Sequence, residues 1–334
     1  MTKRLNDFIK SHFAKRLDVV FIPFTKCNLS CPFCEETQKV IDFDIKAYTN
    51  GSRQLDSILT TIPNDYPLFL DIYGGELFAD AVPEENLNAL DEFIDHVYST
   101  CKQSNRYVHI DIVSNLVHHK ANQILFLKHK YPDLGIVASA NVEGQFTKQI
   151  HKQLFLSNLQ ALRSIRDLRF AAVIDKKSKN LLINQVDCFG VRLFNMLYDE
   201  GYVIDVEPYI DVRNLDDYKI TAEDYAEFIK FAINRYPRLC NMWFYDRSVK
   251  LLSKSTEGLA EYTYTIYCDQ PAKLTDKQNE YIQMVKSRKC FLCRYNSRCS
   301  PRFGTTINKN EFCPDKTIMN IIEINNASIN HTTV

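Results

Sequence analysis

The chain has 334 residues, of which 45% are hydrophobic, 12% aromatic and 25% charged, and only 9 are glycine. This composition is typical of a globular protein, with enough apolar material for one large domain or for one medium and one small domain. Lysine and arginine together number 41, as do aspartate and glutamate. Nucleic acid and anionic membranes are therefore disfavoured as partners, because no net charge attracts them, and so is a tRNA-modifying role.

Residues 1–16 predict an amphipathic helix, because Leu5, Phe8, Ile9, Phe13 and Leu17 follow helical spacing. The segment lacks the apolar core of a signal peptide, and no stretch approaches the roughly 20 apolar residues that span a bilayer. We therefore expect a cytoplasmic protein with no membrane partner. In that compartment clustered cysteines are better interpreted as metal ligands than as disulfides.

Apolar strand-like runs alternate with longer helical patterns up to about residue 210. This alternation predicts an α/β fold built from parallel βαβ units, with too few strands for a closed eight-stranded barrel. A further helix is expected at 221–235, followed by a cysteine-rich segment, 286–314, whose few apolar residues would need a metal to hold them folded. The expected strands are 19–24, 68–73, 108–113, 135–140, 168–173 and 203–207, and the expected helices lie near 52–61, 86–103, 117–130, 147–164 and 180–200.

Three cysteines, Cys27, Cys31 and Cys34, follow the first predicted strand with C-x3-C-x2-C spacing. Chance would place this triplet in about one chain in a hundred of this composition. Three thiolates on a short loop suit an iron–sulfur cluster that keeps one iron open, since a cluster usually takes four. The alternative, a trio of inert buried thiols, is weakened by the position at a strand's carboxyl end, where (β/α) barrels carry their chemistry.

A second motif, Gly74-Gly75-Glu76, follows the second predicted strand. Glycines there allow the backbone to approach a ligand closely, and the carboxylate can accept hydrogen bonds from an ammonium group. By itself this tripeptide is more often a simple turn.

The cysteine triplet together with Gly-Gly-Glu resembles the signature of the radical S-adenosylmethionine (SAM) superfamily. The resemblance implies a partial (β/α)6 barrel over residues 17–235, with a [4Fe-4S] cluster on Cys27, Cys31 and Cys34. Its open iron would chelate SAM, and Gly74, Gly75 and Glu76 would hold the SAM amino group. It also implies reductive cleavage of SAM to a 5′-deoxyadenosyl radical, with the electron supplied by a flavodoxin- or ferredoxin-like partner.

Softer correspondences to the same family follow other predicted strands. Phe33 stands where the family places an aromatic residue near the adenine, and Ser114-Asn115 resembles a pattern that reaches the SAM ribose or carboxylate. Ser139 and Asn141 lie where many members contact SAM, although the family's aspartate is replaced by Asn141. For each polar residue, strand-end capping is the alternative. Residues 172–175 lack the glycine-rich motif of some members, so adenine contacts from that strand are unassigned.

A second cysteine constellation, Cys290, Cys293, Cys299 and Cys313, lies near the C-terminus. It resembles the outer auxiliary cluster of SPASM-type radical SAM enzymes. Phe303 stands where full SPASM domains add a further cysteine, so the resemblance implies one auxiliary [4Fe-4S] cluster in a shortened SPASM or twitch-like domain at 236–334. A structural zinc is the alternative, since spacing alone does not choose the metal.

The four other cysteines have simpler interpretations. Cys101 and Cys188 fall in helical patterns and read as buried small hydrophobes. Cys240 and Cys268 flank the expected joint between barrel and cluster lobe, where some radical SAM epimerases place a hydrogen donor. An inert thiol or a spare cluster ligand is the alternative for each.

The resemblance predicts an oxidoreductase-type radical SAM enzyme that takes hydrogen from an unactivated carbon. Maturation of a ribosomally made peptide is favoured by family frequency. Because only 18 residues precede the first predicted strand, a separate leader-peptide-binding protein or the enzyme's own surface would recognise the peptide. A dehydrogenase or epimerase of a small sugar or aminocyclitol is the alternative, and a non-catalytic iron–sulfur or zinc protein belongs to another class. Gly74–Glu76 argues against the last, since an electron carrier needs no SAM site.

Overall fold

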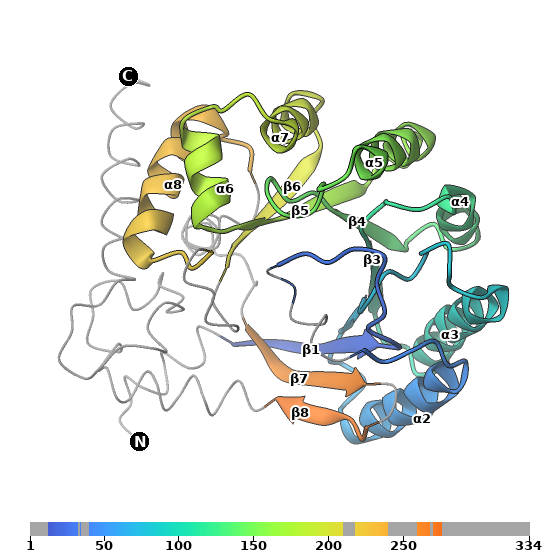
Figure 1. Cartoon of the computed structure of the whole chain (residues 1–334). Coiled ribbons are helices and arrows are strands. Elements are labelled where there is room, and N and C mark those ends of the chain that lie inside the picture. The colour runs from blue at the N-terminus through green and yellow to red at the C-terminus, as the bar shows by residue number, and fades with distance from the viewer. Residues whose placement is uncertain are drawn as a thin grey trace, which may run out of the picture.

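The structure is a computed structural model that describes residues 13–32, 34, 40–209, 218–239, 259–267 and 270–275. These residues form one eight-stranded sheet, and helices cover its outer side (Figure 1). Within these ranges no helix is long and apolar enough to cross a membrane.

Six parallel strands stand in the sheet in the order in which they occur along the chain, and a second pair extends the sheet beyond β1. β7 runs parallel to β1, and β8 is antiparallel to β7. The strands are β1 (Phe13–Ile22), β2 (Leu68–Ile72), β3 (Val108–Ser114), β4 (Gly135–Ser139), β5 (Leu168–Ile174), β6 (Val203–Pro208), β7 (Leu259–Tyr267) and β8 (Lys273–Thr275).

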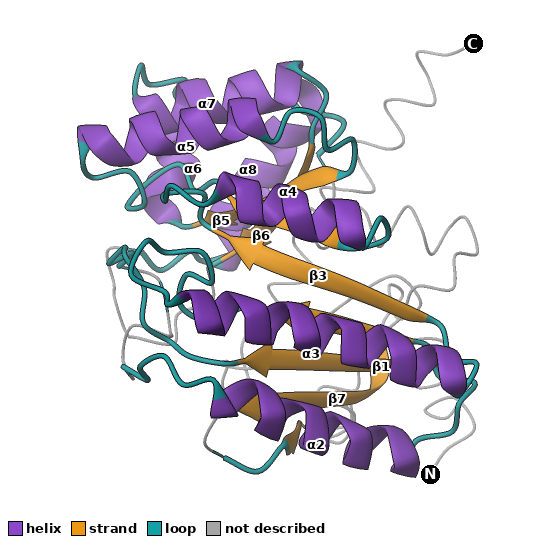
Figure 2. Cartoon of the chain, turned by 90° about the vertical axis from the view of Figure 1, so that its right-hand side faces the viewer, coloured by secondary structure: helices purple, strands orange, loops and turns teal. Residues whose placement is uncertain are grey.

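The helices lie on the convex side of an open arc of strands, and Figure 2 shows α2, α3 and α4 lying alongside the sheet. Crossover helices between parallel strands place all strand carboxyl ends at one edge. The helices are α2 (Lys46–Thr61), α3 (Glu84–Gln103), α4 (Ala121–Lys130), α5 (Gln149–Ala161), α6 (Lys176–Ile183), α7 (Phe189–Asp199) and α8 (Ala222–Arg235).

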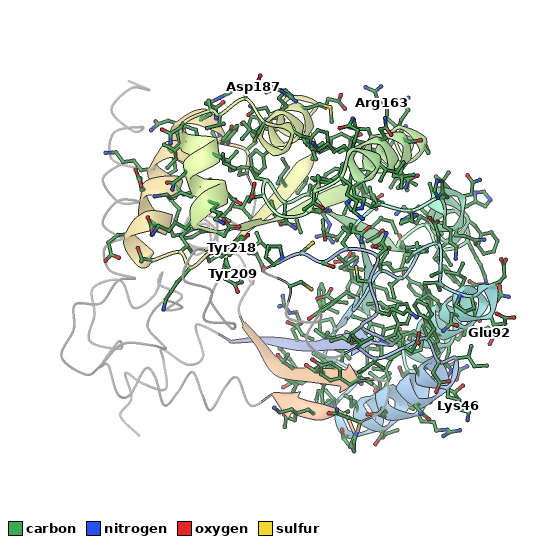
Figure 3. All side chains as sticks on the ribbon, viewed as in Figure 1. Lys46, Glu92, Arg163, Asp187, Tyr209 and Tyr218 are labelled. Atoms are coloured by element: carbon green, nitrogen blue, oxygen red, sulfur yellow. The ribbon has the colours of Figure 1, made fainter. Side chains whose placement is uncertain are left out.

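The hydrophobic core fills the space between the sheet and these helices (Figure 3). Strand alternation produces it: in β2, Leu68, Leu70 and Ile72 are buried toward the helices, while Phe69 and Asp71 face the concave side. The concave side therefore carries the less buried half of β2, β3 and β5.

The expected α/β fold and its six parallel strands are confirmed, with strand ends within a few residues except at the start of β1. The expected helix at 180–200 is two helices, α6 and α7, separated by a turn. The helix expected over residues 1–16 is wrong at Phe13–Arg16, which belong to β1. Pairing of Phe13 and Ala14 with β7 outweighs the helical pattern there, and residues 1–12 lie outside the described ranges.

β7 and β8 fall inside the range 236–334 that the sequence assigns to an auxiliary domain. They belong instead to the same sheet as the six barrel strands, so that sheet does not end at residue 235. The rest of the expected auxiliary domain lies outside the described residues.

Arg106 ties the far end of α2 to the start of β3. Its guanidinium is buried and donates to three backbone carbonyls, those of Leu59 (3.2 Å), Ile62 (2.7 Å) and Tyr66 (2.8 Å). One side chain thus satisfies acceptors at a helix end and in the loop that follows it.

We expect Arg106→Leu to lower the free energy of unfolding by about 3 kcal/mol, because it leaves buried carbonyls without donors. Urea unfolding followed by circular dichroism measures this. Arg53→Leu is the control, because Arg53 is exposed and makes one long hydrogen bond to Asn50. Equal losses in the two variants would contradict the assignment.

Candidate functional site

A cavity of about 320 Å³ opens at the carboxyl ends of β1 to β4. Its size falls at the lower end of the range for small-molecule sites. Ten of its lining residues are those singled out in the sequence: Cys27, Cys31, Cys34, Gly74, Gly75, Glu76, Ser114, Asn115, Ser139 and Asn141. Sequence reasoning missed the other four, Leu29, Tyr73, Val113 and Gln145.

The cysteine loop is closed at its base by backbone pairing. The N–H groups of Thr25 and Lys26 both donate to the carbonyl of Ile41, at 3.1 and 3.2 Å, and the Ile41 N–H donates to the Thr25 hydroxyl at 2.8 Å. The loop therefore leaves β1 and returns to the same point, with the cysteines held between.

All three thiols are half-buried on the cavity wall. The Leu29 N–H donates to Cys27 Sγ at 3.4 Å, and Asn115 Nδ2 lies 3.7 Å from the same sulfur. Burial raises the pKa of Cys27 to about 11 and that of Cys31 to about 12. Both are therefore thiols at neutral pH unless a bound metal takes the place of the proton.

This donor set fits an iron–sulfur cluster. Thiolates are the ligands such clusters take, and an N–H group directed at a ligating sulfur is a typical second interaction. Each cluster thiolate binds a different iron. In the described part of the chain, no three His, Cys, Asp or Glu side chains gather closely enough to hold a single ion.

Gly74 and Gly75 are required by a close approach of two backbones. The Gly75 N–H donates to the Phe24 carbonyl at 2.9 Å, and the Glu76 N–H donates to the Lys26 carbonyl at 3.2 Å. A Cβ on Gly74 would lie 2.2 Å from Phe24 O, and one on Gly75 would lie 1.8 Å from Lys26 O. The sequence predicted that these glycines allow a ligand to approach. In the structure they allow the backbone of the cysteine loop to approach.

The Glu76 carboxylate is 1% exposed and joins the ends of β2 and β3. Its Oε1 accepts from the Ser114 hydroxyl (2.8 Å) and the Phe78 N–H (3.1 Å), and its Oε2 accepts from the Asn115 N–H (2.5 Å). Burial raises the pKa of Glu76 to about 7, against the opposing effect of these donors. A carboxylate has about four acceptor positions, so one remains, on Oε2.

Asn115 connects β3 to the cysteine loop. Its Nδ2 donates to Asn28 Oδ1 at 2.9 Å, its Oδ1 accepts from the Val117 N–H at 2.7 Å, and Asn28 donates in turn to the Val117 carbonyl. Between them, Leu116 adopts a φ of 56°, the left-handed region that glycine would fill in a Thr-Asn-Gly sequence. Asn158 of α5 supports this turn by donating to the Leu116 carbonyl at 2.9 Å.

The polar side chains at the end of β4 differ in how many hydrogen bonds they make within the protein. Asn141 Oδ1 accepts from the Val173 N–H of β5 at 2.7 Å, and Gln145 Oε1 accepts from the Asn141 N–H at 2.8 Å. Asn141 therefore links strand ends, as the capping alternative expects. The Ser139 hydroxyl makes no hydrogen bond within the described ranges, so it is the more available group on this wall.

Charged side chains line the concave face below the cavity. Asp111 Oδ1 lies 3.1 Å from His109 Nε2, and Asp111 Oδ2 accepts a hydrogen bond from Arg169, which lies two strands away. Gly135 of β4 makes this crossing possible, because a Cβ there would lie 1.8 Å from Asp111 Oδ1. Burial and the neighbouring carboxylates of Asp111 and Asp18 raise the pKa of Asp71 to about 6.

Several sequence expectations lie outside the described residues. They are Phe33, Cys240, Cys268, Cys290, Cys293, Cys299 and Cys313. Cys101 is buried in α3 as expected, whereas Cys188 is half-buried and precedes α7.

No known family matches the chain, and no curated protein is similar to it in sequence. Solved structures are similar in fold. Hexahistidine-tagged anSMEcpe with bound AdoMet has a TM-score of 0.64 at 12% identity, covering 96% of each chain. anSMEcpe with bound AdoMet and the Cp18Cys peptide has a TM-score of 0.63 at 12% identity, covering 94% of this chain and 99% of that one. The chain thus shares the fold of anSMEcpe.

We expect Gly75→Ala to lower the free energy of unfolding by about 3 kcal/mol, because the added methyl group would overlap the Lys26 carbonyl and separate the two loops. Urea unfolding of the metal-free protein measures this without interference from a cofactor. An unchanged midpoint would show that the backbones are not in contact.

Proposed function

We propose that this chain is a radical SAM enzyme. One observation carries the proposal: ten residues that the resemblance singled out, in four separate segments, line one cavity. Those segments lie at the carboxyl ends of β1, β2, β3 and β4, which the parallel sheet brings to one edge. The fold shared with AdoMet-bound anSMEcpe supports the same function.

Cys27, Cys31 and Cys34 would hold a [4Fe-4S] cluster, and SAM would occupy the rest of the cavity. When both are bound and a flavodoxin- or ferredoxin-like partner supplies one electron, SAM would be cleaved to methionine and a 5′-deoxyadenosyl radical able to remove hydrogen from an unactivated carbon. The free acceptor position on Glu76 Oε2 would receive an N–H from the SAM ammonium group. Asn115 and the Ser139 hydroxyl would face the ribose or carboxylate.

We propose a peptide as the substrate, in a maturation reaction such as crosslinking, epimerisation or oxidation. Structures of anSMEcpe with Cp18Cys and Kp18Cys peptides, which share this fold, support that choice. The charged concave face supports a polar substrate rather than a lipid. A short precursor gene beside the gene for this chain would separate a peptide modifier from an enzyme of small sugars.

The second cysteine set, Cys290, Cys293, Cys299 and Cys313, is proposed to hold one auxiliary [4Fe-4S] cluster. Iron content tests this independently of SAM chemistry. Zinc at the same four cysteines would leave the proposed SAM chemistry unchanged and would give this C-terminal segment a structural role.

Anaerobic reconstitution followed by dithionite and SAM is expected to yield 5′-deoxyadenosine, with about eight irons per chain if both clusters form. Cys31→Ala should abolish deoxyadenosine formation and lose about half of the iron, because it removes one ligand of the SAM-binding cluster. Chromatography and iron and sulfide counts measure both.

A matched control is Cys101→Ala, which removes a thiol that lies in α3 away from the cavity and should retain deoxyadenosine formation. If the wild-type protein binds no iron at the first three cysteines and cleaves no SAM, the proposed function is wrong.

SAM affinity should depend on the ionisation of Glu76. Because burial raises its pKa to about 7, the carboxylate gains a proton as pH falls, and loses its attraction for an ammonium group. We expect the dissociation constant of SAM to rise about tenfold from pH 8 to pH 6 in wild type. Glu76→Gln should bind weakly at both pH values.

Calorimetry with 5′-methylthioadenosine provides the control, because that nucleoside lacks the amino acid group. Its affinity should not follow the ionisation of Glu76. The same pH response for both ligands would contradict an ammonium contact at Glu76.

A further inference from the structure

A buried histidine stands behind Glu76, on the side away from the cavity. His118 is fully buried and its ring lies 5.7 Å from that of Phe78, centroid to centroid. It does not line the cavity, and none of the sequence motifs includes it. Its contacts nevertheless lead directly to the carboxylate.

The first contact defines the tautomer of the ring. The backbone N–H of Lys120 donates to His118 Nδ1 at 3.1 Å, so Nδ1 carries no proton. A neutral imidazole then carries its hydrogen on Nε2. Burial lowers the pKa of His118 to about 4, with smaller effects from Asp80, Lys120 and His119, which is consistent with a neutral ring.

The second contact orients the Ser114 hydroxyl. His118 Nε2 lies 3.1 Å from Ser114 Oγ, and the Leu116 N–H donates to the same oxygen at 3.1 Å. Both acceptor positions of the hydroxyl are thereby used. Its single proton is left for Glu76 Oε1, 2.8 Å away.

We propose that His118 and Ser114 are positioning residues that orient the Glu76 carboxylate so that its free Oε2 acceptor position faces the cavity. This rests on the proposed function, in which Glu76 receives the SAM ammonium. It also reassigns Ser114, whose hydroxyl is used inside the protein and is not left to contact SAM. The ligand chemistry it defines is a primary ammonium group.

The hydrogen-bond direction can be measured without any ligand. Nitrogen-15 NMR of histidine-labelled wild-type protein, assigned with a His118→Gln sample, should show His118 as the neutral Nε2–H tautomer from pH 6 to pH 8. The Nδ1–H tautomer would reverse the direction of these hydrogen bonds, and a charged ring would put a proton on Nδ1 against the Lys120 N–H; either result would overturn the proposal.

Binding then tests the role. His118→Phe keeps an aromatic ring against Phe78 but removes the donor, so it should weaken SAM binding about tenfold while leaving 5′-methylthioadenosine binding unchanged. His118→Gln restores an N–H donor and should recover most of the loss. His119→Gln is the matched control, because His119 is exposed and, among the described residues, its ring hydrogen-bonds to Asp80 alone.

Ser114→Ala should reproduce the selective loss and supplies the test if His118→Phe does not fold. Equal losses for both ligands, or no loss for SAM, would overturn the positioning role. If wild type bound no SAM, the proposed function would fail first, and the NMR result would still decide the direction of the hydrogen bonds.

Discussion

The backbones that leave β1 and β2 run in contact at the carboxyl edge of the sheet, and the site depends on that contact. Glycine at positions 74 and 75 lets the carbonyls of Phe24 and Lys26 approach within hydrogen-bonding distance. The start of the cysteine loop is thereby attached to the segment that carries Glu76. The two segments are joined directly by backbone hydrogen bonds, with no flexible side chain between them. A shift of either backbone would therefore move the thiols relative to the Glu76 carboxylate.

From Glu76 the constraint extends across the sheet through hydrogen bonds in which nearly every polar atom has a partner. The carboxylate binds Ser114 and the Asn115 N–H, Asn115 reaches Asn28 beside Cys27, and Gln145 connects the end of β4 to the same region. Such a network is rigid when complete and costly when one member is lost. The left-handed turn at Leu116 is tolerated within it because Asn158 holds the turn's carbonyls.

Much of this fold and site could be predicted from the sequence, and the remainder could not for physical reasons. The parallel strands are visible because short apolar runs alternate with longer helical patterns, and the strand ends locate the cysteines, Gly74 to Glu76 and Asn115. β7 has its own signal in alternating tyrosine and threonine, but its place beside β1 depends on a pairing between distant segments. His118, Asn158 and Gln145 belong to no recognisable sequence motif. Their roles depend on contacts between loops that are distant in the sequence and meet only in the folded protein. Ser114 and Asn141 differ, because the sequence patterns locate both residues but do not show that their side chains are used to join strand ends.

The position of β1 between β2 and β7 has a consequence for the order in which the protein forms. Leu17 pairs with Leu68 on one side and with Tyr262 on the other. During synthesis, the strand that leads into the cysteine loop therefore remains an unprotected edge until almost the whole described chain has emerged. Long-range pairing of this kind is slow, and open edges recruit wrong partners. The cysteines nearest the start of the chain thus belong to a part of the sheet that is completed late.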